Sequence, residues 1–225
     1  MPTSSATDAF AKDPPAFLPV PADADVVDDA RFYLTVASDG LWANVCRLVG
    51  VPFDDVVALA PKARIVWITD GSQEAELRAL GCRDQDPPLT SYITAMATEI
   101  PPPEVPGVEV RRADDPDVVR AITRRGWGTA RDEEDGWIAY VDGEPVAWAN
   151  AIACAHGLFL TGGVTVPEAR GRGAYRALVR ARWDEAVRLG TPALVVHAEE
   201  ASRRVLARIG FREVAPVVEL VSGAC

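Results

Sequence analysis

Hydrophobic and polar positions between residues 108 and 222 predict a regular succession of strands and helices. Alternation at 108–112 predicts a strand, and Asp-Pro-Asp at 115–117 predicts the start of a helix that runs to about residue 125. Further strands are expected at 137–141, 145–154, 158–166, 193–197 and 213–222, and further helices at 174–189 and 201–209. This order predicts an α/β fold with a mixed central sheet flanked by helices.

The pattern before residue 100 is weaker but also of the α/β type. Trp42, Val45 and Val49 are spaced as on one face of a helix, and residues 63–68 predict a buried strand. Ser72 is a candidate cap for a helix that stops at Gly81. A strand at about 91–97 closes this half.

Composition divides the chain into four parts. Residues 1–24 hold five prolines and no sustained periodicity, which predicts a mobile arm. Residues 25–100 are expected to form one α/β domain, and residues 101–107 are a proline-rich linker. Residues 108–225 are expected to form the second domain.

The most informative stretch is a glycine-punctuated basic turn between a predicted strand and a predicted helix. Gly171 and Gly173 let the backbone approach an anion without interference from a Cβ atom. The helix that follows offers unpaired N–H groups and the positive end of its dipole. We therefore expect a pyrophosphate site. The alternative is a basic helix start with no ligand.

This turn resembles the acyl-CoA loop of the GNAT superfamily of N-acyltransferases, whose signature is Arg/Gln-x-x-Gly-x-Gly/Ala. Here the signature starts at Arg170, and Tyr175 stands at its last position, where Gly or Ala is usual. The resemblance covers residues 107–225 and implies a GNAT-like fold that binds acetyl-CoA. The expected contacts to the pyrophosphate come from Arg170, Gly171, Arg172, Gly173, Ala174, Tyr175 and Arg176.

Two adjacent glycines, Gly162 and Gly163, interrupt the strand before the loop, and glycine inside a strand usually marks a bulge or a close backbone approach. In the GNAT fold this strand separates from its neighbour and receives the pantetheine arm. The resemblance therefore assigns pantetheine and acyl-carbonyl contacts to Gly163, Val164 and Thr165. An ordinary bend in the strand is the alternative.

The match is thinner at the catalytic positions. Aligned on Gly210, the usual Asn of the family is Glu199, and the usual Tyr that protonates the thiolate is Leu206. A base must still take a proton from the amine, and the candidates are His197 and Glu199. His197 would otherwise be a hydrogen-bonded core histidine, and Glu199 a solvated carboxylate.

The resemblance implies an N-acetyltransferase that moves an acetyl group directly from acetyl-CoA to the amine of a small molecule or peptide. The alternative class is a non-catalytic acyl-CoA-binding or regulatory module, which the replacement of the usual Tyr by Leu206 favours. The sequence leaves monomer and homodimer open.

An internal comparison suggests where the first half came from. Residues 65–82 align with residues 194–211 without a gap, and Val66, Leu77 and Gly81 are identical to their counterparts. We hypothesise a tandem, degenerate GNAT-like repeat whose first copy has no phosphate loop. An unrelated α/β cap is the alternative.

Charge and cysteine usage limit the partners. The net charge is −10 and the isoelectric point about 4.7, so neither nucleic acid nor an anionic membrane is an expected partner. The four cysteines have neither metal-ligand nor disulfide spacing, so no metal is expected. Neither a charged-then-apolar leader nor an apolar run of about 18 residues occurs, which favours a cytoplasmic protein.

Overall fold

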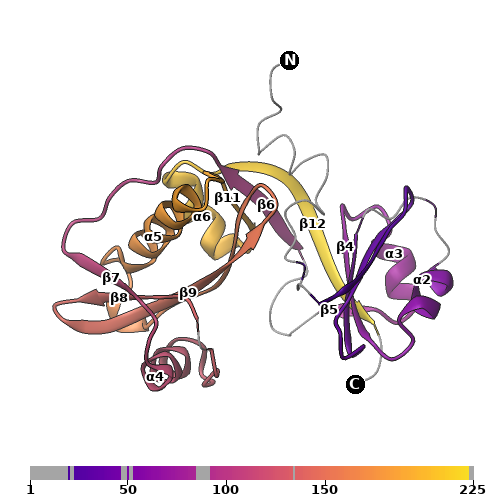
Figure 1. Cartoon of the computed structure of the whole chain (residues 1–225), viewed down its shortest axis with the longest axis horizontal. Helices are drawn as coiled ribbons and strands as arrows, with labels where there is room; N and C mark the ends of the chain where they lie inside the picture. The colour runs from indigo at the N-terminus through magenta and orange to yellow at the C-terminus, as the bar shows by residue number, and fades with distance from the viewer. Residues whose placement is uncertain are drawn as a thin grey trace, which may run out of the picture. The chain divides into compact units, whose positions relative to one another are not determined.

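The structure is a computed structural model that describes residues 20, 23–46, 50, 53–84, 92–133 and 135–222. The chain forms two compact units (Figure 1). The first unit comprises residues 1–96, 197–203 and 213–225, and the second comprises residues 97–196 and 204–212. The first unit therefore includes two segments from the far end of the chain. The domain ranges given above stay a prediction, and most of the predicted arm lies outside the described residues.

The second unit is built on a mixed sheet, as the sequence predicts. Its strands are β7 (Val108–Arg112), β8 (Trp137–Val141), β9 (Glu144–Cys154), β10 (Gly157–Thr165) and the start of β11 (Leu194–Ala198). Neighbouring strands are antiparallel from β7 to β10, whereas β10 and β11 are parallel. The predicted α/β fold is confirmed.

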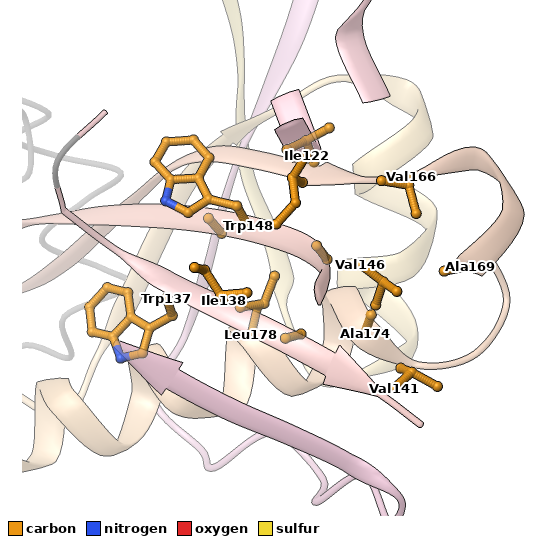
Figure 2. Close-up of a cluster of buried hydrophobic side chains, with 14 of the residues drawn as sticks. Ile122, Trp137, Ile138, Val141, Val146, Trp148, Val166, Ala169, Ala174 and Leu178 are labelled. Carbon is orange, nitrogen blue, oxygen red and sulfur yellow. The ribbon is translucent and has the colours of Figure 1, made fainter. Parts of the chain in front are cut away.

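Helices cover both faces of this sheet. Figure 1 shows α4 (Pro116–Trp127) on one face and α5 (Ala174–Arg188) on the other. The short η2 (Pro167–Ala169) precedes α5, and α6 (Glu200–Arg208) follows β11. Figure 2 shows how side chains of the helices and strands interlock, among them Ile122 of α4, Trp148 of β9 and Leu178 of α5, which are at most 1% exposed. Burial of these apolar faces holds α4 and α5 against the sheet.

The first unit is also of the α/β type and has a hydrophobic core of its own. Its elements are β1 (Asp25–Asp28), β2 (Tyr33–Val36), β3 (Trp42–Cys46), α2 (Phe53–Leu59), β4 (Arg64–Thr69), α3 (Glu74–Ala79), β5 (Arg83–Asp84) and β12 (Arg212–Ser222). The strand order is β1-β2-β3-β4-β12, and β5 also pairs with β12. In the strand order β6 (Tyr92–Thr98) follows β12 and precedes β11. Val218 and Leu220 of β12 belong to this core.

The helix expected from Trp42 and Val45 is wrong, because these residues lie in β3. Ala43 and Val45 are fully buried while Trp42 is only partly buried, so the true period is two residues. β3 pairs in parallel with β4, and aromatic and β-branched residues suit such a strand. Val49 lies outside the described residues. Three apolar residues at helical spacing were too few to distinguish the two periods.

The prediction that Ser72 caps a helix is also wrong. The N-cap residue of α3 is Gln73, and its side chain makes no capping hydrogen bond. Ser72 instead belongs to an Asp turn, in which its N–H donates to Asp70 Oδ1 at 2.9 Å. This local hydrogen bond competes with a capping role.

The end of α3 and the end of α6 have the same hydrogen bonds. The Cys82 N–H donates to Leu77 O at 3.0 Å, and the Phe211 N–H donates to Leu206 O at 3.1 Å. The glycine before each donor has a positive φ, 88° and 103° respectively. Leu77 and Leu206 are both fully buried. A parallel strand pair precedes each helix, β3 with β4 and β10 with β11, which supports the hypothesis of an internal repeat.

The start of α4 offers a test of the fold. Asp115 accepts a hydrogen bond from the Asp117 N–H at 2.9 Å and caps the helix. Asp115→Ala should lower the free energy of unfolding by about 1 kcal/mol, because one amide loses its acceptor. The neighbouring Asp114→Ala removes the same charge without a cap and is the control. Urea unfolding followed by circular dichroism measures both, and equal effects would contradict the capping role.

Candidate active site

The glycine-punctuated turn has the backbone geometry expected of an anion cradle. Gly171 and Gly173 have φ values of 79° and 91°, in the left-handed region that side chains disfavour. Gly173 is the residue before α5, and its carbonyl accepts from the Ala177 N–H at 3.0 Å. Because Gly173 has no side chain, the N-cap residue cannot cap this end of α5, and the first turn of the helix contains no acidic residue. Among the described residues, the first amides of α5 therefore have no hydrogen-bond acceptor at the positive end of the helix.

Space around the two glycines differs. A Cβ atom on Gly171 would meet no atom within 4 Å, so this side of the turn is open to a ligand. A Cβ atom on Gly173 would lie 2.6 Å from Val105 Cγ1, so the turn packs closely against the segment before β7. The geometry fits a pyrophosphate group on the open side of the turn.

Four arginines surround the turn and differ in their partners. Arg172 forms an ion pair with Asp142, and Arg125 of α4 contacts Glu168 of η2. Within the described part of the chain, Arg170 and Arg176 make no ion pair, and both are exposed. These two side chains are therefore available to phosphate oxygens.

The paired glycines of β10 form a bulge, as the sequence predicts. Thr161 is opposite Asn150 and Val164 is opposite Trp148, so Gly162 and Gly163 together face a single residue of β9. A Cβ atom on Gly162 would lie 2.8 Å from the Trp148 ring. On Gly163 it would lie 2.8 Å from the ring of Tyr175. Gly162 also has a φ of 65°, so this position requires glycine, whereas a side chain at position 163 would require the Tyr175 ring to move.

One edge of β10 lacks a strand partner from the bulge onward. β10 pairs with β11 at Leu158 and Phe159, and no further pair between these strands follows among the described residues. On the other edge, Val164 and Thr165 pair with β9. The backbone groups of residues 163–165 on the unpaired edge can therefore hydrogen-bond an extended ligand, the arrangement expected for pantetheine.

Of the two candidate bases, His197 has the better-defined surroundings. Its Nδ1 atom lies 2.8 Å from Glu219 Oε1, and the two side chains are 7% and 21% exposed. A carboxylate oxygen accepts hydrogen bonds, so this contact favours the tautomer with the proton on Nδ1, in which Nε2 can accept a proton. This contact lies in the first unit, whereas the loop and the bulge belong to the second.

Glu199 and Leu206 complete the comparison with the family pattern. Glu199 is half-buried just before α6, where its carbonyl accepts from the Arg203 N–H at 2.8 Å. Its carboxylate makes no hydrogen bond or ion pair with the described residues. Leu206 is fully buried, so its position supplies packing and no proton.

Two of the acidic residues in the run 132–135 form ion pairs within their own unit. Asp132 pairs with Arg120 at 2.9 Å and Asp135 with Arg112 at 3.3 Å. Beside this run, Trp127 is 40% exposed and packs edge-on against Trp148 with ring centroids 6.2 Å apart. The aromatic pair links the surface to the bulge, because Trp148 also covers Gly162.

Sequence reasoning missed Glu219 and Trp148. Glu219 is a lone acidic residue in the apolar run 217–221, and this signal could have marked it as a partner for a buried polar group. Nothing in the sequence marks Trp148, because its role depends on its position opposite the bulge. Among the described residues there is no group of three or more His, Cys, Asp or Glu side chains that could hold a metal ion. No helix of the described chain is long and apolar enough to span a bilayer.

Comparison with known proteins agrees with this geometry. The profile of the Acetyltransferase (GNAT) family matches residues 95–211. A GCN5-related N-acetyltransferase from Kribbella flavida superposes with a TM-score of 0.61 at 18% identity, covering 90% of this chain and 91% of that chain. A GCN5-related N-acetyltransferase-like protein from Streptococcus suis has a TM-score of 0.56 at 14% identity, covering 89% and 88%.

A third similar structure is a tandem GNAT protein from the clavulanic acid biosynthesis pathway. Its TM-score is 0.52 at 14% identity, and the match covers 97% of this chain and 88% of that chain. These likenesses show a shared fold. No curated protein sequence matches the chain significantly.

Proposed function

Because the chain belongs to the Acetyltransferase (GNAT) family, we propose that it transfers the acetyl group of acetyl-CoA to the nitrogen of an amine acceptor. The observation that carries this proposal is the turn at Gly171 and Gly173, which presents uncapped helix amides next to an open space. A family of acetyltransferases and a phosphate-binding turn together favour acetyl-CoA as the acyl donor.

The amides of residues 171–176 would hold the pyrophosphate, assisted by Arg170 and Arg176. The unpaired edge of β10 at Gly163, Val164 and Thr165 would then bind pantetheine and fix the thioester carbonyl. A backbone amide of this edge could stabilise the oxyanion that develops on the carbonyl oxygen.

In the reaction the amine nitrogen attacks the thioester carbon, the C–N bond forms and the C–S bond breaks. The thiolate of CoA leaves and gains a proton, and a base accepts the proton lost by the nitrogen. We propose His197 as this base, because Glu219 lies 2.8 Å from its Nδ1 and can orient the ring. Glu199 is the second candidate. Transfer is direct, since this scheme needs no covalent intermediate.

The acceptor would be a small-molecule or peptide amine, and we propose a cytoplasmic location. No disulfide joins Cys46, Cys82 and Cys154 in the described part of the chain, as expected in a reducing compartment. We also propose that residues 25–100 are a degenerate GNAT-like copy. The matching helix ends of α3 and α6, and the overall likeness to a tandem GNAT protein, support this.

A non-catalytic acyl-CoA-binding role is the alternative, and one observation favours it. Leu206 is buried at the position where relatives carry a tyrosine that protonates the thiolate. Release of free thiol from acetyl-CoA across a panel of amines distinguishes the two roles. An enzyme releases thiol above the rate of hydrolysis, whereas a binding module does not.

Thermal unfolding tests the cofactor first. Acetyl-CoA at about 100 times its Kd should stabilise the protein by about 2.7 kcal/mol and raise the Tm by about 5–10 °C. The shift is expected in the transition of the second unit, which holds the loop. Dephospho-CoA is the control for the contribution of the 3′-phosphate. An unchanged Tm at millimolar acetyl-CoA would contradict the assignment of the loop.

A further inference from the structure

A charged side chain lies on the apolar face of α5. Arg182 is only 1% exposed, although leucine, valine and tryptophan side chains surround it on the same helix face. Its Nε donates to Leu178 O and its Nη1 donates to Asn150 O, both at 3.0 Å. Its Nη2 has no hydrogen-bond partner within the described residues. A buried N–H group without an acceptor lowers the free energy of unfolding. The presence of an arginine at this buried position therefore needs an explanation.

Arg182 also has no carboxylate partner among the described residues. Burial lowers the pKa of Arg182 to about 10, and the adjacent Tyr175 side chain partly opposes this through its charge and through a hydrogen bond to the guanidinium. The guanidinium is thus still charged at neutral pH. A buried charge normally requires a counter-ion, because removing it from water costs several kcal/mol. The interior of the second unit therefore contains a positive charge that no carboxylate of the described residues compensates.

The position of Arg182 connects it to the proposed thioester site. Asn150, whose carbonyl receives Nη1, is the β9 partner of Thr161, the residue just before the bulge. Tyr175 contacts both places: a Cβ atom built on Gly163 would lie 2.8 Å from its ring, and its side chain also interacts with Arg182. Gly163 itself is exposed. A chain that enters at Gly163 would therefore meet Tyr175 first and Arg182 behind it.

We propose that Arg182 receives the terminal carboxylate of an acyl group, so that the donor is a dicarboxylic acyl-CoA such as succinyl-CoA. The inference rests on the proposed function and specifies its acyl donor. The unpartnered Nη2 and the neighbouring Nη1 form one side of a guanidinium fork, which matches the two oxygens of a carboxylate. Tyr175 must turn aside from Gly163 to admit the acyl chain, and its hydroxyl can then donate to the same carboxylate.

Calorimetric titration of the whole chain tests the proposal with succinyl-CoA, butyryl-CoA and acetyl-CoA. Succinyl and butyryl chains have the same number of carbon atoms and differ in the terminal carboxylate. Succinyl-CoA should bind roughly 10- to 100-fold more tightly than butyryl-CoA, as expected for charge-assisted hydrogen bonds. Arg182→Met should abolish this preference and change the acetyl-CoA affinity by less than threefold. Arg188→Met, a change at an exposed position of the same helix, should retain the preference.

Equal affinities of the wild-type protein for succinyl-CoA and butyryl-CoA would overturn the proposal, as would a preference that survives in Arg182→Met. If Arg182→Met does not fold, Tyr175→Phe replaces it, and it should reduce the preference severalfold. Acetyl-CoA that binds without any preference for succinyl-CoA overturns this inference alone. Failure of all three thioesters to bind would also overturn the proposed function.

Discussion

Gly173→Val should weaken acetyl-CoA binding roughly 100- to 10,000-fold, as loss of two charge-assisted amide hydrogen bonds would do. The new Cβ atom would lie 2.6 Å from Val105 Cγ1, and valine disfavours a φ of 91°. The turn must therefore move, and the first amides of α5 move with it. Isothermal titration with acetyl-CoA measures the loss, and circular dichroism confirms that the fold is retained.

Substitutions at two glycines with the same backbone geometry can distinguish an effect on ligand binding from an effect of backbone strain. Gly171 and Gly190 have the same φ of 79°, and a Cβ atom on either would meet nothing within 4 Å. They precede and follow α5. Gly171→Val and Gly190→Val should destabilise the protein equally, by about 1–2 kcal/mol. Only Gly171→Val should weaken acetyl-CoA binding, and equal affinity in both variants would refute the loop as the pyrophosphate site.

His197→Ala should lower kcat by roughly 100- to 10,000-fold if His197 is the general base. The affinity for acetyl-CoA should stay within twofold of the wild-type value, because the binding amides lie elsewhere. Steady-state release of free thiol with a saturating amine gives kcat, and titration gives the affinity. Glu199→Gln tests the other candidate in the same assay. A large loss in Glu199→Gln and none in His197→Ala would exchange the two roles.

Glu219→Gln tests whether Glu219 positions the His197 ring. The amide retains an oxygen that can accept from His197 Nδ1 but removes the negative charge beside the ring. A positioning role predicts a smaller fall in kcat than in His197→Ala, with KM unchanged. A rise in KM alone would point to a contribution to substrate binding instead.

Local sequence signals predicted the second half well. The cap at Asp115 and the glycines at 171 and 173 each favour a local conformation that few other residues support. These residues act over a few positions, so their effect can be read from the sequence alone. The same is true of the bulge at Gly162 and Gly163, because glycine has a limited set of uses inside a strand.

Features that depend on distant parts of the chain could not be predicted. Trp42 and Val45 form a strand because β4 lies beside them, and tertiary pairing outweighs a spacing of three and four residues. The contact between His197 and Glu219 joins two strands that a helix separates. The burial of Arg182 could likewise not be predicted from the sequence, because an arginine near the middle of a helix is normally exposed.

The pairing of β12 with β4 also has a consequence for synthesis on the ribosome. Residues 65–69 of β4 pair with residues 218–222, so the core of the first unit lacks Val218 and Leu220 until these residues have been synthesised. At a synthesis rate of about 5–20 residues per second, β12 is made roughly 8–30 s after β4. During that interval one edge of β4 is exposed in the nascent chain, and chaperones that bind apolar strands have time to act.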